Sequence, residues 1–359
     1  MNHFQKVADR LSAYDLDGFL VLSEPNRLYV TGFPSTAGAA LVTKEGSWFF
    51  TDSRYIEAAR RAIGGAEVLE NTAKRPTLAQ VEELIGSRGL RRIGYEDAYL
   101  TVAELRRLEE KLSCELVPAT KLLLELRAVK DPEEIRQMIA AQRIAEKALE
   151  EVLNFIRPGR TEREIAAFLQ YKMLLGGGEK MSFDPIVVSG PNSSMPHGVP
   201  GDRSVGEGDF ITMDFGCVCG GYCSDMTRTV AVGHVTEEME RVYATVLEAQ
   251  RAGIGIARAG ITGAAVHNAA AKVIGDAGYG PYFGHAFGHS LGVEIHESPN
   301  ATPSNEEPLP AGAVVSAEPG IYLPGRFGVR IEDVIVVEEG GCRDITLADK
   351  ALLILPASK

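Results

Sequence analysis

The segment from residue 210 to residue 232 most constrains this chain, because it predicts a β-hairpin with two carboxylates on one face. It reads FITMDFGCVCGGYCSDMTRTVAV, and the central Gly220-Gly221 is a strong hairpin dipeptide. If these glycines form the turn, Asp214 faces Thr227, and Asp225 is a diagonal neighbour of Asp214 about 7–8 Å away. Apolar residues surround both aspartates, and buried carboxylates without partners are costly. The hairpin therefore favours a cation site over an exposed acidic face.

Three later segments add one imidazole and two carboxylates to this pair. His289 lies in FGHAFGHSLG, Glu318 ends the strand-like VVSAEPG, and Glu332 lies in GVRIEDV. Taken alone, Glu318 fits an edge carboxylate and Glu332 fits a surface pair with Arg330. Beside the aspartate hairpin, we interpret all five residues as ligands, because four carboxylates and one imidazole suit two divalent cations sharing a site. Such a centre generates hydroxide at neutral pH.

The remaining histidines of interest lie close to glycines. His285 and His296 flank His289, and the glycines at 284, 288 and 292 argue against a helix there. Glycine at these positions lets the backbone approach a site closely. His197 lies in the Pro/Gly-rich MPHGVP segment, where a loop side chain can meet a substrate.

Composition restricts the class of protein. The 359 residues are ample for two domains, and the net charge of −12 without a basic run argues against nucleic acid or an anionic membrane as a partner. No stretch approaches the roughly 18 apolar residues of a membrane-spanning helix, and the N-terminus lacks the apolar core of a signal peptide. We therefore expect a soluble, cytoplasmic protein.

The five cysteines predict no disulfide framework, since an odd count in a large chain fits a reducing compartment. Cys217, Cys219 and Cys223 resemble a thiolate cluster, which is the alternative to be weighed. However, Cys217 and Cys219 alternate on a predicted strand, and a turn separates them from Cys223. We interpret them as small strand residues, because a zinc site needs four convergent ligands.

The chain divides into two predicted domains near residue 126. Residues 1–126 alternate strand-like and helical runs, which indicates an α/β unit, and they contain no cluster of candidate ligands. Residues 127–359 begin with a helix capped by Asp131 and Glu134, and further helices are predicted from Thr161, from Glu237 to Arg251 and from Thr262 to Ile274. The intervening strands hold every candidate ligand, which predicts an α+β domain whose sheet is shielded by helices on one face.

Six segments together resemble the signature segments of the pita-bread metallopeptidases: MPHGVP, MDFG, YCSDMTRTVAVG, GHAFGHSLGVEIHE, AEPGIY and GVRIED. That family includes Xaa-Pro aminopeptidase (aminopeptidase P), Xaa-Pro dipeptidase (prolidase), methionine aminopeptidase and creatinase. The resemblance covers residues 127–359, and residues 1–125 resemble the N-terminal domain of its prolidase, aminopeptidase P and creatinase branch. It implies an α+β chain in which a pita-bread catalytic domain follows a smaller α/β creatinase-type domain.

The resemblance also implies a role for each site residue. Asp214 would chelate one metal, His289 and Glu318 the other, and Asp225 and Glu332 would bridge both. The metals of this family are typically manganese or cobalt, sometimes zinc, and the family implies a homodimer. Four other residues match its substrate-site histidines and the arginine beside its ligands: His197, His285, His296 and Arg330.

The activity implied is hydrolysis of the Xaa-Pro bond at the N-terminus of proline-containing peptides by a hydroxide held between two metals. Glu318 would carry a proton from the attacking water to the proline nitrogen, and His296 would polarise the scissile carbonyl. His197 would line the site for proline beside these two residues. In several prolidases an arginine after HE-x-P binds the carboxylate of a dipeptide, whereas HESPN places Asn300 there. This favours an Xaa-Pro aminopeptidase over a strict dipeptidase. The complete ligand set argues against a silent binding protein and a creatinase-type amidinohydrolase.

Overall fold

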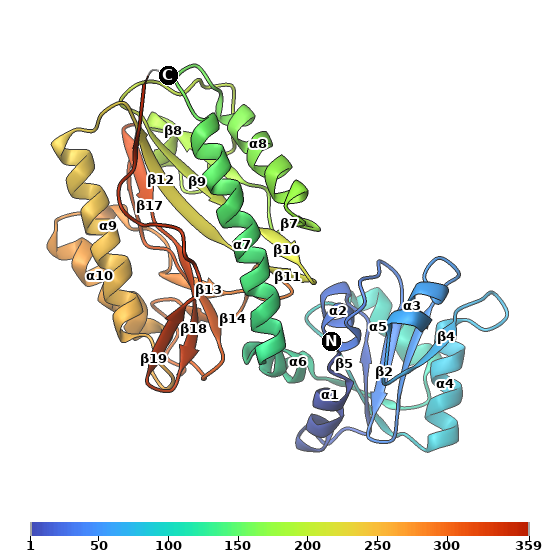
Figure 1. Ribbon diagram of the computed structural model, residues 1–359. Coiled ribbons are helices and arrows are strands. Elements are labelled where there is room, and N and C mark those ends of the chain that lie inside the picture. The colour runs from blue at the N-terminus through green and yellow to red at the C-terminus, as the bar shows by residue number, and fades with distance from the viewer. Residues whose placement is uncertain (1, 358–359) are drawn as a thin grey trace. The chain divides into compact units, whose positions relative to one another are not determined.

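The computed structural model describes residues 2–357, in two compact units, Met1–Arg127 and Ala128–Lys359 (Figure 1). No helix within the described range is long and apolar enough to cross a membrane. Each unit has its own sheets and core, and the predicted ligands all belong to the second unit.

The N-terminal unit is an α/β layer built on one six-stranded sheet, as its alternating pattern predicts. The strand order is β4-β3-β2-β1-β5-β6, and β2 alone runs antiparallel to its neighbours. The strands are β1 (Gly18–Val21), β2 (Ala39–Thr43), β3 (Ser47–Thr51), β4 (Glu67–Glu70), β5 (Arg92–Tyr95) and β6 (Glu115–Pro118). The helices are α1 (Phe4–Arg10), the 3-10 turn Leu11–Tyr14, α2 (Glu24–Thr31), α3 (Ile56–Ala62), α4 (Thr77–Arg88), α5 (Val102–Lys111) and α6 (Thr120–Ala128).

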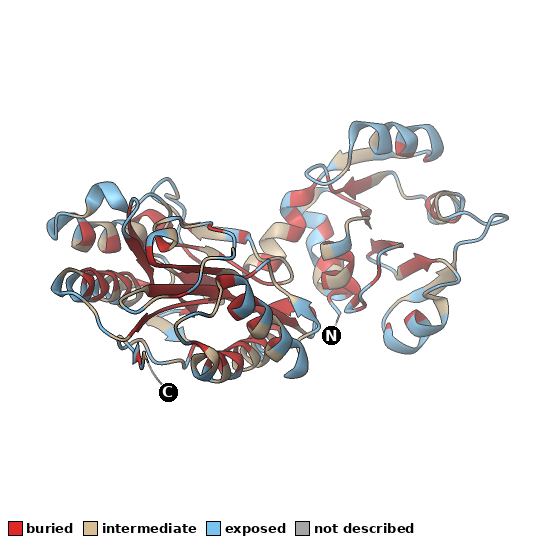
Figure 2. Ribbon diagram, turned by 90° about the horizontal axis from the view of Figure 1, so that it is seen from above, coloured by how far each residue is buried: buried red, intermediate tan, exposed pale blue. Residues whose placement is uncertain are grey.

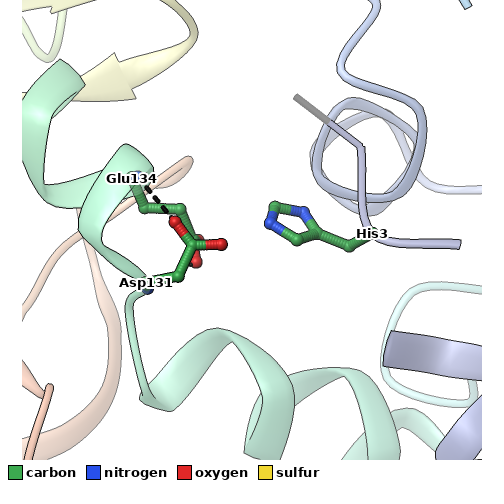
Figure 3. Close-up of side chains that lie close together, drawn as sticks. All are labelled: His3, Asp131 and Glu134. Atoms are coloured by element: carbon green, nitrogen blue, oxygen red, sulfur yellow. Dashed lines mark hydrogen bonds between the residues drawn. The ribbon is translucent and has the colours of Figure 1, made fainter. Parts of the chain in front are cut away.

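Four α-helices frame the C-terminal unit: α7 (Pro132–Phe155), α8 (Glu162–Leu175), α9 (Glu237–Ile256) and α10 (Gly263–Asp276). The predicted capping box of α7 is present, since Asp131 accepts hydrogen bonds from the backbone of Glu133 and Glu134 while the Glu134 side chain accepts from the Asp131 N–H. Figure 3 shows the side chains of Asp131 and Glu134 close together at the start of α7. Thr161 and Glu164 form the same box on α8. Helix α9 continues past Arg251 to Ile256, because Gly253 packs against Phe287 and the glycines there do not end it.

The strands of this unit form a four-stranded sheet, β20-β12-β9-β8, a five-stranded sheet, β14-β13-β15-β18-β19, and two small ones, β11-β10-β7 and β16-β17. Their bounds are β7 (Lys180–Met181), β8 (Ile186–Ser189), β9 (Phe210–Phe215), β10 (Cys217–Cys219), β11 (Tyr222–Cys223), β12 (Met226–Val232), β13 (Gly288–Ser290), β14 (Glu297–Ala301), β15 (Val314–Ala317), β16 (Gly320–Leu323), β17 (Phe327–Arg330), β18 (Asp333–Glu338), β19 (Gly341–Asp344) and β20 (Ile354–Leu355). Two 3-10 turns, Gly190–Ser194 and Gly280–Tyr282, complete the fold.

The predicted hairpin register is confirmed. Asp214 lies opposite Thr227, and the turn glycines have φ values of 58° and 80°, as a type I′ turn requires. The two predicted strands are each divided, into β9 and β10 at Gly216 and into β11 and β12 at Ser224 and Asp225. At the break, a Cβ on Gly216 would lie 1.9 Å from the carbonyl oxygen of Ser224, so the two arms approach more closely than side chains allow.

Helices cover one face of each main sheet, which leaves the opposite face for the ligands. On β9, Ile211, Met213 and Phe215 belong to the core formed with α7 and α8. Because side chains alternate along a strand, Thr212 and Asp214 project from the other face. Val315 and Ala317 of β15 pack in the core of α9 and α10. Figure 2 shows the buried strands and the exposed outer sides of the helices.

We expect Phe210→Ala to destabilise this unit by about 3–5 kcal/mol, because a buried aromatic side chain would leave a cavity. Phe210 is fully buried and lies edge-on to Phe327, with ring centroids 5.5 Å apart. Tyr171→Ala, at an exposed position of α8, should change stability by less than about 0.5 kcal/mol. Urea unfolding measures both, and equal midpoints for the two variants would contradict the packing described.

Candidate metal centre

One cavity of about 500 Å³ in the C-terminal unit gathers every site residue predicted from the sequence. The residues reach it from separate parts of the fold. Asp214 comes from β9, and Asp225 from the position directly before β12. Glu318 directly follows β15, and Glu332 lies between β17 and β18. The complete set of predicted residues in its lining is His197, Asp214, Asp225, His285, His289, His296, Glu318, Arg330 and Glu332.

The candidate ligands converge closely enough to share a cation. One ligand atom from each of Asp225, His289 and Glu332 lies within 4.8 Å of the other two. The His289 Nε2 atom is 3.5 Å from Asp225 Oδ2 and 3.4 Å from Glu318 Oε1. Asp214 lies on the strand paired with β12, and its carboxylate faces the same cavity.

Unsatisfied oxygens show that these residues fit metal ions. The Oδ1 atoms of Asp214 and Asp225 are buried, and neither has a hydrogen-bond partner among the described residues. Leaving a buried acceptor unpaired costs about 1–3 kcal/mol, and more when it is charged. A divalent cation would satisfy both oxygens, and carboxylate oxygens with an imidazole nitrogen are the donors that manganese, cobalt and zinc accept.

The electrostatics of the apoprotein disfavour four ionised carboxylates. Burial, followed by the charges of Glu332 and Asp214, raises the pKa of Asp225 well above its ordinary value. Burial and the charges of Glu318 and Asp214 raise the pKa of Glu332 in the same way. Burial also raises the pKa of Glu318 to about 7. Cations bound here would relieve this repulsion.

Arg330 is the only permanent cation among the cavity-lining residues, and it braces two ligands. Its guanidinium donates to Asp214 Oδ2 at 2.5 Å, and its Nε atom donates to the Thr227 hydroxyl at 3.0 Å. Thr227 in turn donates to Glu332 Oε2 at 2.7 Å. Arg330 thereby orients one ligand directly and another through Thr227.

A second arginine, Arg228, supports Glu332 from the opposite face of β12, and sequence reasoning missed it. Its Nη1 atom donates to the carbonyl oxygens of Glu332 at 2.6 Å and Thr227 at 2.9 Å. Asp333 pairs with it at 2.7 Å, and both side chains are buried. The alternation in MTRT and the adjacent acids in IED were the available signals, because neighbouring strand residues project to opposite faces.

Ser316 and a close backbone contact hold His289. The Ser316 hydroxyl accepts from the His289 N–H at 3.0 Å and donates to Glu318 Oε1 at 2.9 Å. The prediction that glycine allows a close backbone approach holds at Gly288, where a Cβ would lie 1.9 Å from the Ser316 carbonyl oxygen. It is wrong for Gly284, which has open space around its Cβ position.

The other histidines surround the ligands. His296 meets the His289 ring edge-on, with centroids 4.4 Å apart. His285 Nε2 lies 2.9 Å from the Tyr322 hydroxyl, which also accepts from Arg330. Burial lowers the pKa of His285 to about 4, so its ring is neutral near pH 7. Tyr322 is a site residue that the sequence did not single out.

The cysteines are not part of this centre. All five are free, and burial raises the pKa of Cys217 to about 11 and that of Cys223 to about 12. Both are therefore thiols at neutral pH in the structure, and no cysteine is among the described residues that line the cavity.

Comparison with known proteins identifies the family. Residues 136–339 match the model of metallopeptidase family M24, and residues 4–129 match the creatinase/prolidase N-terminal domain. The chain belongs to metallopeptidase family M24. The predicted pita-bread catalytic domain and creatinase-type N-terminal domain are confirmed, as is the prediction of a metal-dependent peptidase.

Individual M24 relatives match along almost the whole chain. The uncharacterized peptidase YqhT of Bacillus subtilis is 39% identical over 352 residues, covering 98% of this chain and 99% of that protein. The structure of an Xaa-Pro dipeptidase from Bacillus anthracis is 38% identical, with a TM-score of 0.93, and 98% of this chain and 99% of that chain are covered. An X-Pro aminopeptidase structure from Thermotoga maritima is 34% identical, with a TM-score of 0.92, covering 99% of this chain and 100% of that chain.

The raised carboxyl pKa values predict an unusual pH dependence for the metal-free M24 protein. Glu318 has a pKa of about 7 when folded, against about 4.3 when unfolded. Between these two pKa values the folded state holds a proton that the unfolded state has released. The free energy of unfolding therefore falls as pH rises, by at most about 1.4 kcal/mol per pH unit for each such proton. Divalent cations should reverse the fall, because ligation replaces those protons.

Thermal unfolding between pH 4.5 and pH 7.5, with chelator and with Mn²⁺, measures this dependence. Glu318→Gln should flatten the slope of the metal-free protein, and Glu339→Gln, at an exposed position, should not. A metal-free protein that becomes more stable as pH rises through this window would contradict the assignment of raised pKa values.

Proposed function

We propose that this M24 protein is an Xaa-Pro aminopeptidase, which hydrolyses the Xaa-Pro bond at the N-terminus of peptides. The observation that carries the proposal is the convergence of four carboxylates and His289 in one cavity that His197, His285 and His296 also line. The names of the relatives, an Xaa-Pro dipeptidase and an X-Pro aminopeptidase, support the Xaa-Pro bond as the substrate class.

Two divalent cations, most simply Mn²⁺ with Co²⁺ or Zn²⁺ as alternatives, fit the ligand set. Asp214 would hold one cation, His289 and Glu318 the other, and Asp225 and Glu332 would bridge them. When bound, the cations supply Lewis acidity and lower the pKa of a water molecule that attacks the peptide.

The chain's own residues supply proton transfer and orientation. Glu318 lines the cavity with its Oε1 atom 3.4 Å from His289 Nε2, where its carboxylate would accept a proton from the attacking water and deliver it to the proline nitrogen as the C–N bond breaks. Burial keeps the pKa of His296 below its ordinary value, so the neutral ring can donate a hydrogen bond to the scissile carbonyl oxygen. His197 and His285 line the cavity where the proline would lie.

The cavity favours peptides longer than dipeptides. A dipeptide carries its carboxylate next to the scissile bond, and binding it calls for an available cation. Among the cavity-lining residues, Arg330 already pairs with Asp214. Asn300 accepts a hydrogen bond from the Ser290 N–H at 3.1 Å. Arg326, a possible substitute, pairs with Glu238 outside the cavity.

Removing the proton shuttle should abolish turnover without unfolding the protein. We expect Glu318→Gln to lower kcat by about 10²–10⁴-fold, the contribution typical of general acid–base catalysis. Asp225→Asn should also lower bound metal, because it removes a bridging carboxylate. Release of the N-terminal residue from Xaa-Pro-Yaa peptides, elemental analysis and circular dichroism measure these effects. Glu339→Gln is the matched control, and full activity in Glu318→Gln would reject the mechanism.

Comparing tripeptide and dipeptide substrates tests whether the protein is an Xaa-Pro aminopeptidase or an Xaa-Pro dipeptidase. With Mn²⁺, Co²⁺ or Zn²⁺ added, we expect kcat/KM for Xaa-Pro-Yaa tripeptides to exceed that for the corresponding Xaa-Pro dipeptides by about tenfold, since one tenfold step corresponds to about 1.4 kcal/mol of lost binding. Equal or faster cleavage of dipeptides would make the protein a prolidase. Cleavage of neither substrate in metal-replete protein would reject both.

A further inference from the structure

Glu162, the first residue of α8, is a fully buried carboxylate outside the metal centre. Its Oε1 atom accepts from the Ser189 N–H at 2.7 Å, the Ser189 hydroxyl at 2.9 Å and the Asn192 side-chain amide at 3.1 Å. Its Oε2 atom accepts from the Gly201 N–H at 3.1 Å. Residues 190–201 are named here the His197 loop; Ser189 directly precedes it, Asn192 lies near its start and Gly201 is its last residue.

The His197 loop leads from Glu162 to the cavity. In its middle, the Ser193 hydroxyl accepts from the Gly328 N–H of β17 at 2.8 Å. Arg330 donates to the carbonyl oxygen of Pro196 at 3.2 Å, directly before His197. Pro196, His197 and Val199 all line the cavity, and Val199 is 84% exposed. A loop this open at its tip depends on its anchors for a defined position.

The helix itself does not need Glu162. Thr161 and Glu164 already form the capping box at the start of α8, with hydrogen bonds to each other's backbone N–H groups. The helix N-terminus stabilises the charge of Glu162 through the helix dipole, and its donors replace the lost hydration. A carboxylate accepts only, so it can receive hydrogen bonds from both ends of the loop at once.

We propose that Glu162 is a positioning residue that holds the His197 loop in the conformation that binds peptides. It does not line the cavity, and it acts on substrate through Ser189, Asn192 and Gly201. This inference rests on the proposed function for its kinetic consequences. The anchoring of the loop stands independently of it.

Glu162→Gln tests the proposal, because the amide places an N–H₂ group against donors of the loop and leaves them unsatisfied. We expect KM for Xaa-Pro-Yaa peptides to rise about tenfold or more, as hydrogen bonds to a charged group are lost. Bound metal should stay at the wild-type level, and kcat should change much less than KM. Amide hydrogen exchange across residues 190–201 should accelerate. Glu164→Gln, two residues further along α8 and half exposed, is the matched control and should show none of these changes.

Asn192→Ala is a second variant, which removes one donor of the loop and leaves the buried carboxylate in place. It should raise KM and loop exchange in the same direction but less, and it decides the matter if Glu162→Gln does not fold. Unchanged KM and unchanged exchange in a folded variant, loss of metal in proportion to activity, or equal effects of Glu164→Gln would each overturn the proposal. If wild-type protein cleaves no Xaa-Pro peptide, the proposed function fails, while the exchange experiment still tests the anchoring.

Discussion

The structure of the catalytic unit depends on burying four carboxylates against one cavity. Asp225 and Glu332 are almost fully buried, and burial together with the charges of neighbouring acids raises the pKa of each. Such a cluster is unfavourable without cations, because every carboxylate loses hydration and faces like charges. The surrounding fold is arranged to hold these groups in place despite the repulsion, and metal binding is what makes the arrangement favourable.

Two arginines, Arg330 at the end of β17 and Arg228 on β12, help to hold the ligands in different ways. Arg330 faces the cavity and places a positive charge against Asp214. Arg228 lies behind the ligands, where Asp333 neutralises it and its remaining donors hold the Glu332 backbone. The first arginine contributes charge to the site, and the second contributes rigidity without adding net charge. Glu162 holds the His197 loop in a similar way, because its carboxylate accepts hydrogen bonds from N–H and O–H groups at or beside the two ends of the loop.

Much of this site could be predicted because its geometry is local. The pairing of Asp214 with Thr227 follows from counting outward from the Gly220 turn, and the caps of α7 and α8 follow from residues three positions apart. The interruption at Gly216 could not be predicted, because it arises from contact with the Ser224 carbonyl oxygen across the hairpin. The roles of Arg228 and Glu162 also escaped prediction, since their partners lie far away in the chain or on a loop without periodicity.

The sequence by itself determined the class of chemistry, because each candidate ligand lies in a short continuous motif that can be recognised without the fold. It also determined the two-part organisation of α/β and α+β segments, because hydrophobic periodicity is a property of neighbouring residues. Only the tertiary structure decided which oxygen atoms lack partners, which cation is already paired and which buried acid anchors the His197 loop. Those properties depend on contacts between segments that are far apart in the chain, from the 39 residues between Glu162 and Gly201 to the 116 between Asp214 and Arg330. Such contacts exist only once the sheets have packed.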